Sequence, residues 1–181
     1  MQRRFTLKAL TAAVALAGTA SLPALAQSGG TIKVGILHSL SGTMAISETV
    51  LKDTALKAIE EINAKGGGLG RKLEVVFRDD KGQPAEAVKH AQELVESDKV
   101  VMITGSFLSN VGLAVSDWAK QNKTMFLAAE ALTEALTWSK GHDHTVRLRP
   151  NTYEQGRMLA DKAGKMKYVK WATIGPNYEY G

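Results

Sequence analysis

Residues 31–71 have the sequence TIKVGILHSLSGTMAISETVLKDTALKAIEEINAKGGGLGR and carry the clearest fold signal in the chain. Residues 32–37 are apolar apart from Lys33, which is typical of a strand that a parallel sheet buries on both faces. A polar loop rich in serine and threonine follows. Residues 49–65 then place apolar side chains three or four positions apart, as an amphipathic helix does. The glycine-rich turn after this helix completes a strand–loop–helix–turn unit.

The same alternation continues along the chain. We predict strands at residues 73–77, 100–103 and 124–128, a second helix that begins at Pro84, and a third helix at residues 111–121. Alternating strands and helices with short connections predict a parallel, doubly wound α/β sheet. The stripes expected to face the sheet are Leu51, Ala55, Ala58, Ile59 and Ile62 in the first helix and Ala85, Val88, Ala91, Leu94 and Val95 in the second.

The regularity weakens after residue 129. Residues 131–140 fit a short helix, and residues 145–149 alternate apolar with basic side chains as a strand does. Beyond Pro150, residues 151–166 predict a new amphipathic helix and residues 168–174 a new strand. We therefore expect a first lobe at residues 27–149 and the truncated start of a second α/β lobe at residues 150–181.

Residues 1–26 predict a signal peptide rather than part of the fold. Basic residues precede a small, apolar run at residues 9–22, and Ala-Leu-Ala at residues 24–26 fits a cleavage site. The apolar run is too short to span a bilayer, which argues against a membrane anchor. An arginine pair partly resembles a twin-arginine signal, but Thr6 stands where that pattern prefers phenylalanine. We expect cleavage after Ala26 and release into the bacterial periplasm.

The composition excludes several classes of protein. The chain has no cysteine, so disulfides, thiolate metal sites, cysteine nucleophiles and a lipid-anchored N-terminal cysteine are ruled out. Removing residues 1–26, which carry three basic and no acidic side chains, lowers the formal net charge from +5 to +2. No basic run with interleaved aromatics occurs, so we expect no nucleic-acid partner. The remaining 155 residues suffice for a domain with a hydrophobic core.

Ligands of open parallel sheets bind at the carboxyl ends of the strands. That rule selects the loops at residues 38–48, 78–82, 104–110 and 129–133. The third of these loops leads directly into a helix, where Ser109 or Asn110 can act as a cap. A hydroxyl beside free helix N–H groups can equally bind a carboxylate, so both roles stay open. Glu130, just after a buried strand, either faces the cleft or is a solvated loop residue.

Other motifs carry less weight. GGGLG at residues 66–70 follows a helix, whereas a dinucleotide-binding loop follows a strand. His142 and His144 form a candidate metal pair, but no third ligand stands at a suitable spacing, and solvated histidines are the simpler interpretation. Asp79-Asp80 is either a paired-acid site or a strand-ending turn. No G-x-S-x-G elbow occurs. We therefore expect no catalytic residue, no metal and no cofactor.

Four segments carry a family resemblance: IKVGILHSLSGTMAISE, AIEEINAKGGGLGRKLEVVFRDDKGQPAEAV, VVMITGSFLSNVGLAVSDWA and PNYEYG. They resemble periplasmic solute-binding proteins of the leucine/isoleucine/valine-binding group, which are receptors for branched-chain amino acid ABC importers. The resemblance covers residues 31–181. It implies the type I periplasmic-binding fold, in which hinge strands join two α/β lobes and the ligand is clamped between them. The first loop is most similar to the urea and short-amide branch.

The resemblance also implies site residues. In the family's amino-acid binders, a serine at the start of the third helix holds the ligand carboxylate, and Ser109 matches it. The second contact segment usually carries Ala-Thr, whereas here Leu132 follows Ala131, and Thr133 substitutes only if the loop shifts by one position. Leu132 and Glu130 therefore argue against a standard leucine-type ligand. The loop analysis and the resemblance together give the expected ligand-binding set: Ser47, Ser109, Asn110, Glu130, Ala131, Thr133 and Tyr178, with Tyr180 as the alternative tyrosine.

The function implied by the resemblance is that of a binding protein rather than an enzyme. It is a monomeric substrate-binding component of an ABC importer, which captures a small polar solute by lobe closure and delivers it to an inner-membrane permease. The implied solute is a branched-chain amino acid or a related amide, urea or organic acid. One alternative is a ligand-sensing regulator on the same fold, which would add a signalling module. Another is an exported hydrolase, which would need a nucleophile–base pair.

Overall fold

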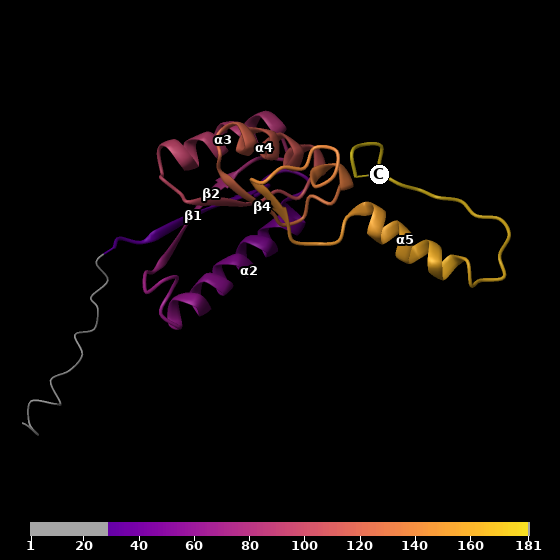
Figure 1. Ribbon diagram of the computed structural model, residues 1–181, viewed down its shortest axis with the longest axis horizontal. Coiled ribbons are helices and arrows are strands. Elements are labelled where there is room, and N and C mark those ends of the chain that lie inside the picture. The colour runs from indigo at the N-terminus through magenta and orange to yellow at the C-terminus, as the bar shows by residue number, and fades with distance from the viewer. Residues whose placement is uncertain (1–28, 181) are drawn as a thin grey trace, which may run out of the picture. The chain divides into compact units, whose positions relative to one another are not determined.

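The computed structural model describes residues 29–180, so the predicted signal peptide and its cleavage site lie outside the described residues. Thr31–Gly181 forms one compact unit. The described part of this unit contains five strands, four α-helices and one 3₁₀ helix (Figure 1). No helix among the residues that the structure describes is long and apolar enough to cross a membrane.

The five strands form one parallel sheet, which confirms the predicted doubly wound α/β class. The strands are β1 (Ile32–His38), β2 (Leu73–Asp79), β3 (Met102–Gly105), β4 (Met125–Ala128) and β5 (Thr145–Arg147). Their order across the sheet is β2-β1-β3-β4-β5, and every neighbouring pair is parallel. All five carboxyl ends therefore lie at the same edge, and the loops that follow them meet there.

Helices cover both faces of the sheet. They are α2 (Ala45–Ala64), α3 (Pro84–Glu96) and α4 (Ser109–Gln121). Figure 1 shows α3 and α4 side by side on one face and α2 on the other. This arrangement follows from the strand order. After β2 the chain crosses back over β1 to form β3, so the strands are then added in the opposite direction. Because the connections are right-handed, the helices after β2 lie on the opposite face of the sheet from α2. Pro84 begins α3 at a position where its missing N–H costs nothing.

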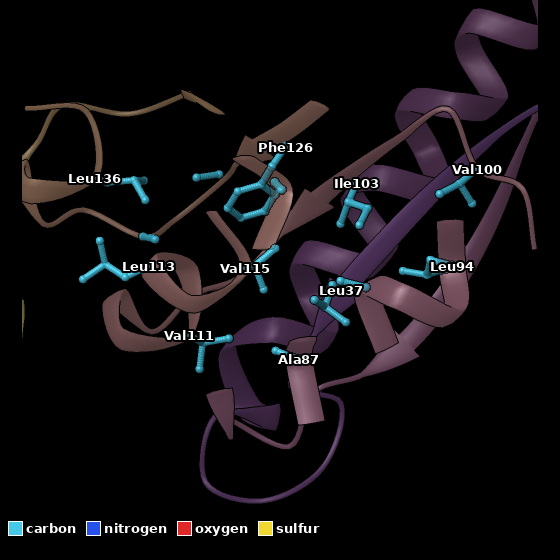
Figure 2. Close-up of a cluster of buried hydrophobic side chains, with 14 residues drawn as sticks. Leu37, Ala87, Leu94, Val100, Ile103, Val111, Leu113, Val115, Phe126 and Leu136 are labelled. Atoms are coloured by element: carbon cyan, nitrogen blue, oxygen red, sulfur yellow. The ribbon is translucent and has the colours of Figure 1, made fainter. Parts of the chain in front are cut away.

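The hydrophobic core fills the space between the sheet and the α3–α4 layer (Figure 2). Leu37, Ile103 and Phe126 enter it from the strands, and all three side chains are fully buried. Leu94 of α3 and Val115 of α4 close it from the other side, and both are also fully buried. Burying a side chain of this size stabilises the fold by about 1.5–3 kcal/mol. This core holds β1, β3 and β4 in place beneath the loops at the carboxyl edge.

Two of the predicted helix faces need correction. In α2, Ile62 is 40% exposed and Ala58 is also exposed, so only Leu51, Ala55 and Ile59 of the stripe are partly buried. In α3, Ala85 is exposed whereas Ala87 is completely buried. Alanines occur on both sides of α3, and a shift of two residues turns a helix by about 200°. The apolar spacing alone therefore does not distinguish the two faces.

The region after β4 also differs from expectation. The predicted helix at residues 131–140 is only a 3₁₀ turn, Glu134–Leu136, and the helix predicted at residues 151–166 is the shorter α5 (Thr152–Ala163). The strand predicted at residues 168–174 is wrong: Val169 and Ile174 are 91% and 102% exposed. A strand needs a neighbour to accept its backbone hydrogen bonds. The sheet of the described unit has no partner paired with this segment.

Candidate functional site

Backbone hydrogen bonds join the carboxyl ends of β1, β3 and β4 into one surface. The Ser106 N–H donates to the Leu37 carbonyl at 2.8 Å, and the Ala129 N–H donates to the Gly105 carbonyl at 3.0 Å. Gly105 has a φ of +131°, a conformation that glycine adopts readily and other residues avoid. The three strand ends are thus fixed relative to one another, and the loops that follow start from a rigid base.

Ser109 links two of the predicted contact segments. It is the first residue of α4, and its Oγ accepts a hydrogen bond from the Thr133 N–H at 3.2 Å. The helix N-cap is Leu108, and no side chain caps this end, so the predicted capping role of Ser109 or Asn110 is not observed. Ser109 is 1% exposed. Its hydroxyl hydrogen remains a donor, because the bond to Thr133 uses only an acceptor lone pair.

Buried polar atoms without a partner gather at the same edge. Among the described residues they are Glu48 Oε1 near the start of α2, Asp80 Oδ2 after β2, Ser106 Oγ after β3 and Asn110 Oδ1 in the first turn of α4. Each such atom costs about 1–3 kcal/mol relative to a hydrogen-bonded one. A stability requirement alone would not place all of them at one end of the sheet. Their positions make this edge the candidate functional site.

A groove of ≈ 270 Å³ is lined in part by Phe107, which precedes Ser109 by two residues, and by Leu132, which precedes Thr133. It brings together two of the predicted site residues, Glu130 and Tyr178. Glu130 forms an ion pair with Arg149, and its side chain is only 13% exposed. Burial raises the pKa of the Tyr178 hydroxyl, as do the nearby Tyr180 and Glu179. The groove is lined by Phe107, Glu130, Leu132, Arg149, Gln155, Tyr178 and Tyr180.

The other predicted residues lie outside the lining of this groove. Ser47 is exposed in the first turn of α2. Ala131 and Thr133 are buried, and Ala131 packs against Gly112 of α4 so closely that an added β-carbon on Gly112 would lie 2.4 Å from the Ala131 β-carbon. Asn110 is half-buried. The structure therefore groups Ser109, Ala131 and Thr133 in one wall, Glu130 and Tyr178 in the adjacent groove, and leaves Ser47 apart.

The acidic pair at the end of β2, Asp79 and Asp80, forms a turn, as one of the two interpretations of the sequence predicted. Asp79 Oδ1 accepts from the Leu40 and Lys81 N–H groups, and Asp80 Oδ1 accepts from the Gly82 N–H at 2.8 Å. Burial acts to raise the pKa of Asp79, but hydrogen bonds from Ser41, Lys81 and Leu40 outweigh it, and the net shift is downward. Asp80 is 1% exposed, and burial raises the pKa of its carboxyl in spite of its hydrogen bonds.

The raised pKa of Asp80 predicts a pH dependence of stability. The folded protein holds this proton more tightly than the unfolded chain, so stability falls as the pH rises from about 3.8 through the folded-state pKa. Asp80→Asn keeps an oxygen at Oδ1 and carries no charge, so we expect this fall to disappear. Urea denaturation of the full-length protein between about pH 4 and 8 measures it. If the stability of Asp80→Asn fell with pH as steeply as that of the exposed control Asp53→Asn, Asp80 would not be the group responsible.

Sequence reasoning missed the buried contacts of the first loop. Glu48, His38 and Ser39 form a hydrogen-bonded group, although Glu48 lies in a run of polar residues that favours exposure. The histidines considered as a candidate metal pair form hydrogen bonds within the chain: His142 Nε2 lies 2.9 Å from Ser116 Oγ, and His142 Nδ1 accepts from the His144 N–H. No group of three or more metal-ligating side chains occurs within residues 29–180.

Comparison with known proteins gives consistent matches. A family model described as "Periplasmic binding protein" matches residues 31–181. The Leu/Ile/Val-binding protein BraC3 of Rhizobium johnstonii is 33% identical over 177 residues, which cover 97% of this chain and 47% of the relative. The Leu/Ile/Val-binding protein homolog 3 of Brucella melitensis is 30% identical, with coverages of 95% and 46%. The chain thus spans about half the length of these curated relatives.

Solved structures agree with the sequence relatives. The branched-chain amino acid transporter substrate-binding protein LivJ of Streptococcus pneumoniae, in complex with isoleucine, has a TM-score of 0.69 at 30% identity over 75% of this chain and 38% of its own. A solute-binding protein of an ABC transporter from Rhodopseudomonas palustris, in complex with 3,4-dihydroxybenzoic acid, has a TM-score of 0.66 at 29% identity, with coverages of 75% and 36%.

Proposed function

Because the chain belongs to the periplasmic binding protein family, we propose that it is the substrate-binding component of an ABC importer. The observation that carries the proposal is the family match over residues 31–181, combined with a groove at the carboxyl edge of the sheet. The relative BraC3 is a Leu/Ile/Val-binding protein, and the two structural neighbours are a substrate-binding protein of a branched-chain amino acid transporter and a solute-binding protein of an ABC transporter. In this role the protein acts as a monomer that binds a solute without converting it and delivers it to an inner-membrane permease.

The proposed working cycle uses two lobes. Residues 27–149 form the first lobe, and residues 150–181 begin the second, after export and cleavage behind Ala26. Two features support this boundary: Pro150 follows β5 closely, and α5 has no buried residue against the first lobe. Solute binding would bias a hinge motion toward the closed state, because the solute contacts both lobes only when they are closed.

The proposed solute is a branched-chain amino acid or a related amide, urea or organic acid. The ligands named for the two structural neighbours, isoleucine and 3,4-dihydroxybenzoic acid, both carry a carboxylate beside an apolar group. The wall formed by Ser109 and the first turn of α4 suits a carboxylate, since free helix N–H groups attract anions. Phe107 and Leu132 supply an apolar surface in the adjacent groove.

A thermal-shift screen of the full-length protein tests the proposal. The panel contains branched-chain amino acids, short amides, urea and aromatic acids, each at up to millimolar concentration. A solute at about 100 times its Kd stabilises the folded state by about 2.7 kcal/mol, which is a clear shift. The account predicts such a shift for a carboxylate-bearing member of the panel. Absence of any shift across the panel would contradict it.

Ser109→Ala is expected to weaken the binding of that solute without unfolding the protein. The lost hydroxyl removes a charge-assisted hydrogen bond, worth about 1.5–3 kcal/mol, and leaves the Thr133 N–H without its partner. Calorimetric titration measures the change, with the exposed Ser139→Ala as the matched control. Unchanged affinity would restrict Ser109 to its structural bond with Thr133. A neutral solute as the best binder would refute the carboxylate role even if affinity fell.

A further inference from the structure

The loop that follows β1 is held at its base by a buried carboxylate. Glu48 lies in the first turn of α2, yet it is 0% exposed. Its Oε2 accepts the Ser39 N–H at 2.8 Å and lies 2.9 Å from Nδ1 of His38, the last residue of β1. Because both bonds converge on one oxygen, the start of the loop and the start of α2 are tied together across nine or ten residues of chain.

A second set of bonds fixes the same loop to the turn after β2. Ser39 Oγ donates to Asp80 Oδ1 at 2.6 Å, and the Leu40 N–H donates to Asp79 Oδ1 at 2.9 Å. His38, Ser39 and Asp80 are all at least nine-tenths buried. Beyond this anchored base, Ser41, Gly42 and Thr43 are exposed. The loop therefore has a rigid base and an exposed, hydroxyl-bearing tip at the carboxyl edge of the sheet.

Helix stability does not explain why Glu48 is buried. An acid in a first helical turn interacts favourably with the helix dipole while remaining in water. Burial removes that hydration, and Glu48 Oε1 has no hydrogen-bond partner. An apolar side chain at a buried position of this kind is often at least as stabilising as a buried ion pair. What an apolar residue lacks is an acceptor for the Ser39 N–H and His38 Nδ1, and these two contacts determine the loop conformation.

We propose that Glu48 is a positioning residue that holds residues 39–44 in one conformation at the solute-binding edge. Its relevance to binding rests on the proposed function, whereas its effect on the loop does not. The mechanism is the convergence of two hydrogen bonds on Oε2, and it gives a specific expectation for substitutions. Glu48→Ala removes the acceptor, while Glu48→Gln can place its amide oxygen at the same position and retain both bonds.

Hydrogen exchange on the full-length protein tests the proposal without any ligand. We expect Glu48→Ala to accelerate exchange in residues 37–44 by about 10- to 150-fold, the factor that corresponds to losing hydrogen bonds to a charged group. Residues 109–121 should keep wild-type exchange, and Glu48→Gln should restore most of the protection. Glu61→Ala, an exposed acid on the same helix, is the control and should leave residues 37–44 unchanged.

Three results would overturn the positioning role. The first is that Glu48→Ala accelerates exchange uniformly throughout the unit. The second is that it changes exchange in residues 37–44 no more than Glu61→Ala does. The third is that these residues exchange as fast in Glu48→Gln as in Glu48→Ala. Calorimetry with L-isoleucine and 3,4-dihydroxybenzoate as probes then measures the consequence for binding, which we expect to be a loss of at least about tenfold in Glu48→Ala. A wild-type protein that bound neither probe would count against the proposed function, while the exchange data would still decide the role of Glu48.

Discussion

Gly105→Ala is expected to destabilise the protein more than any other single methyl addition at the carboxyl edge. The new β-carbon would lie 2.0 Å from the Leu37 carbonyl oxygen and 2.8 Å from its carbon. Those atoms belong to the backbone of β1, the strand paired with β3 at this position, so they cannot move aside. The φ of +131° adds backbone strain for any residue other than glycine. We expect a loss above about 4 kcal/mol, which approaches the total stability of many domains.

Chemical denaturation of the full-length protein measures this loss. Gly70→Ala is the matched control, because Gly70 also has a positive φ, +74°, but no atom lies within 4 Å of its added β-carbon. Gly70→Ala should cost only about 1–2 kcal/mol of backbone strain. The difference between the two variants isolates the clash with Leu37. Equal effects of the two substitutions would mean that β1 and β3 are not packed as closely as the structure has them.

Gly112→Leu is expected to weaken solute binding strongly at moderate cost in stability. Gly112 lies in the first turn of α4, and even a methyl group there would approach the Ala131 β-carbon to 2.4 Å. A leucine must push the segment around Ala131 away from α4 and thereby break the bond between Ser109 and Thr133. Overpacking of this kind costs about 1–3 kcal/mol, occasionally more. Because the wall that contains Ser109, Ala131 and Thr133 is then disrupted, we expect affinity to fall by at least about 100-fold, or about 2.7 kcal/mol.

Calorimetry with the solute from the thermal-shift screen measures the loss, and denaturation shows whether the variant is folded. Gly156→Leu is the control, because no atom lies within 4 Å of a β-carbon added at that helical glycine. It adds the same side chain without disturbing the site, so it should bind normally. A folded Gly112→Leu protein with wild-type affinity would show that the α4 terminus and the segment around Ala131 do not form the binding wall.

The sheet and its covering helices could be predicted because each leaves a local signal. A buried parallel strand such as β1 is a continuous apolar run, and α3 carries a clear apolar stripe. The signal fails where the outcome depends on distant residues. Apolar residues at 168–174 predict a strand, but a strand exists only where another strand pairs with it. The choice between Ala85 and Ala87 likewise depends on which face of α3 meets the sheet.

The site was predictable only in outline. Parallel strands place the four loops at one edge, and two of these loops contribute Phe107, Glu130 and Leu132 to one groove. The partners of individual side chains were not predictable. Ser109 binds the Thr133 N–H rather than a helix N–H, because the segment after β4 folds over the start of α4. Glu48 is buried where it contacts His38, the last residue of β1, and Ser39, which follows it. Such contacts link residues with no shared sequence pattern.

Calorimetric titration of the full-length protein with the best solute of the screen tests whether the protein binds a solute without converting it. We expect saturable binding of one solute per protein, a negative heat-capacity change from burial of apolar surface, and complete recovery of the unaltered solute afterwards. Heat that continues with time, together with a chemically changed solute, would identify an enzyme instead. If no solute selected by the screen bound in a one-to-one ratio, the proposal that this chain captures a solute for import would be contradicted.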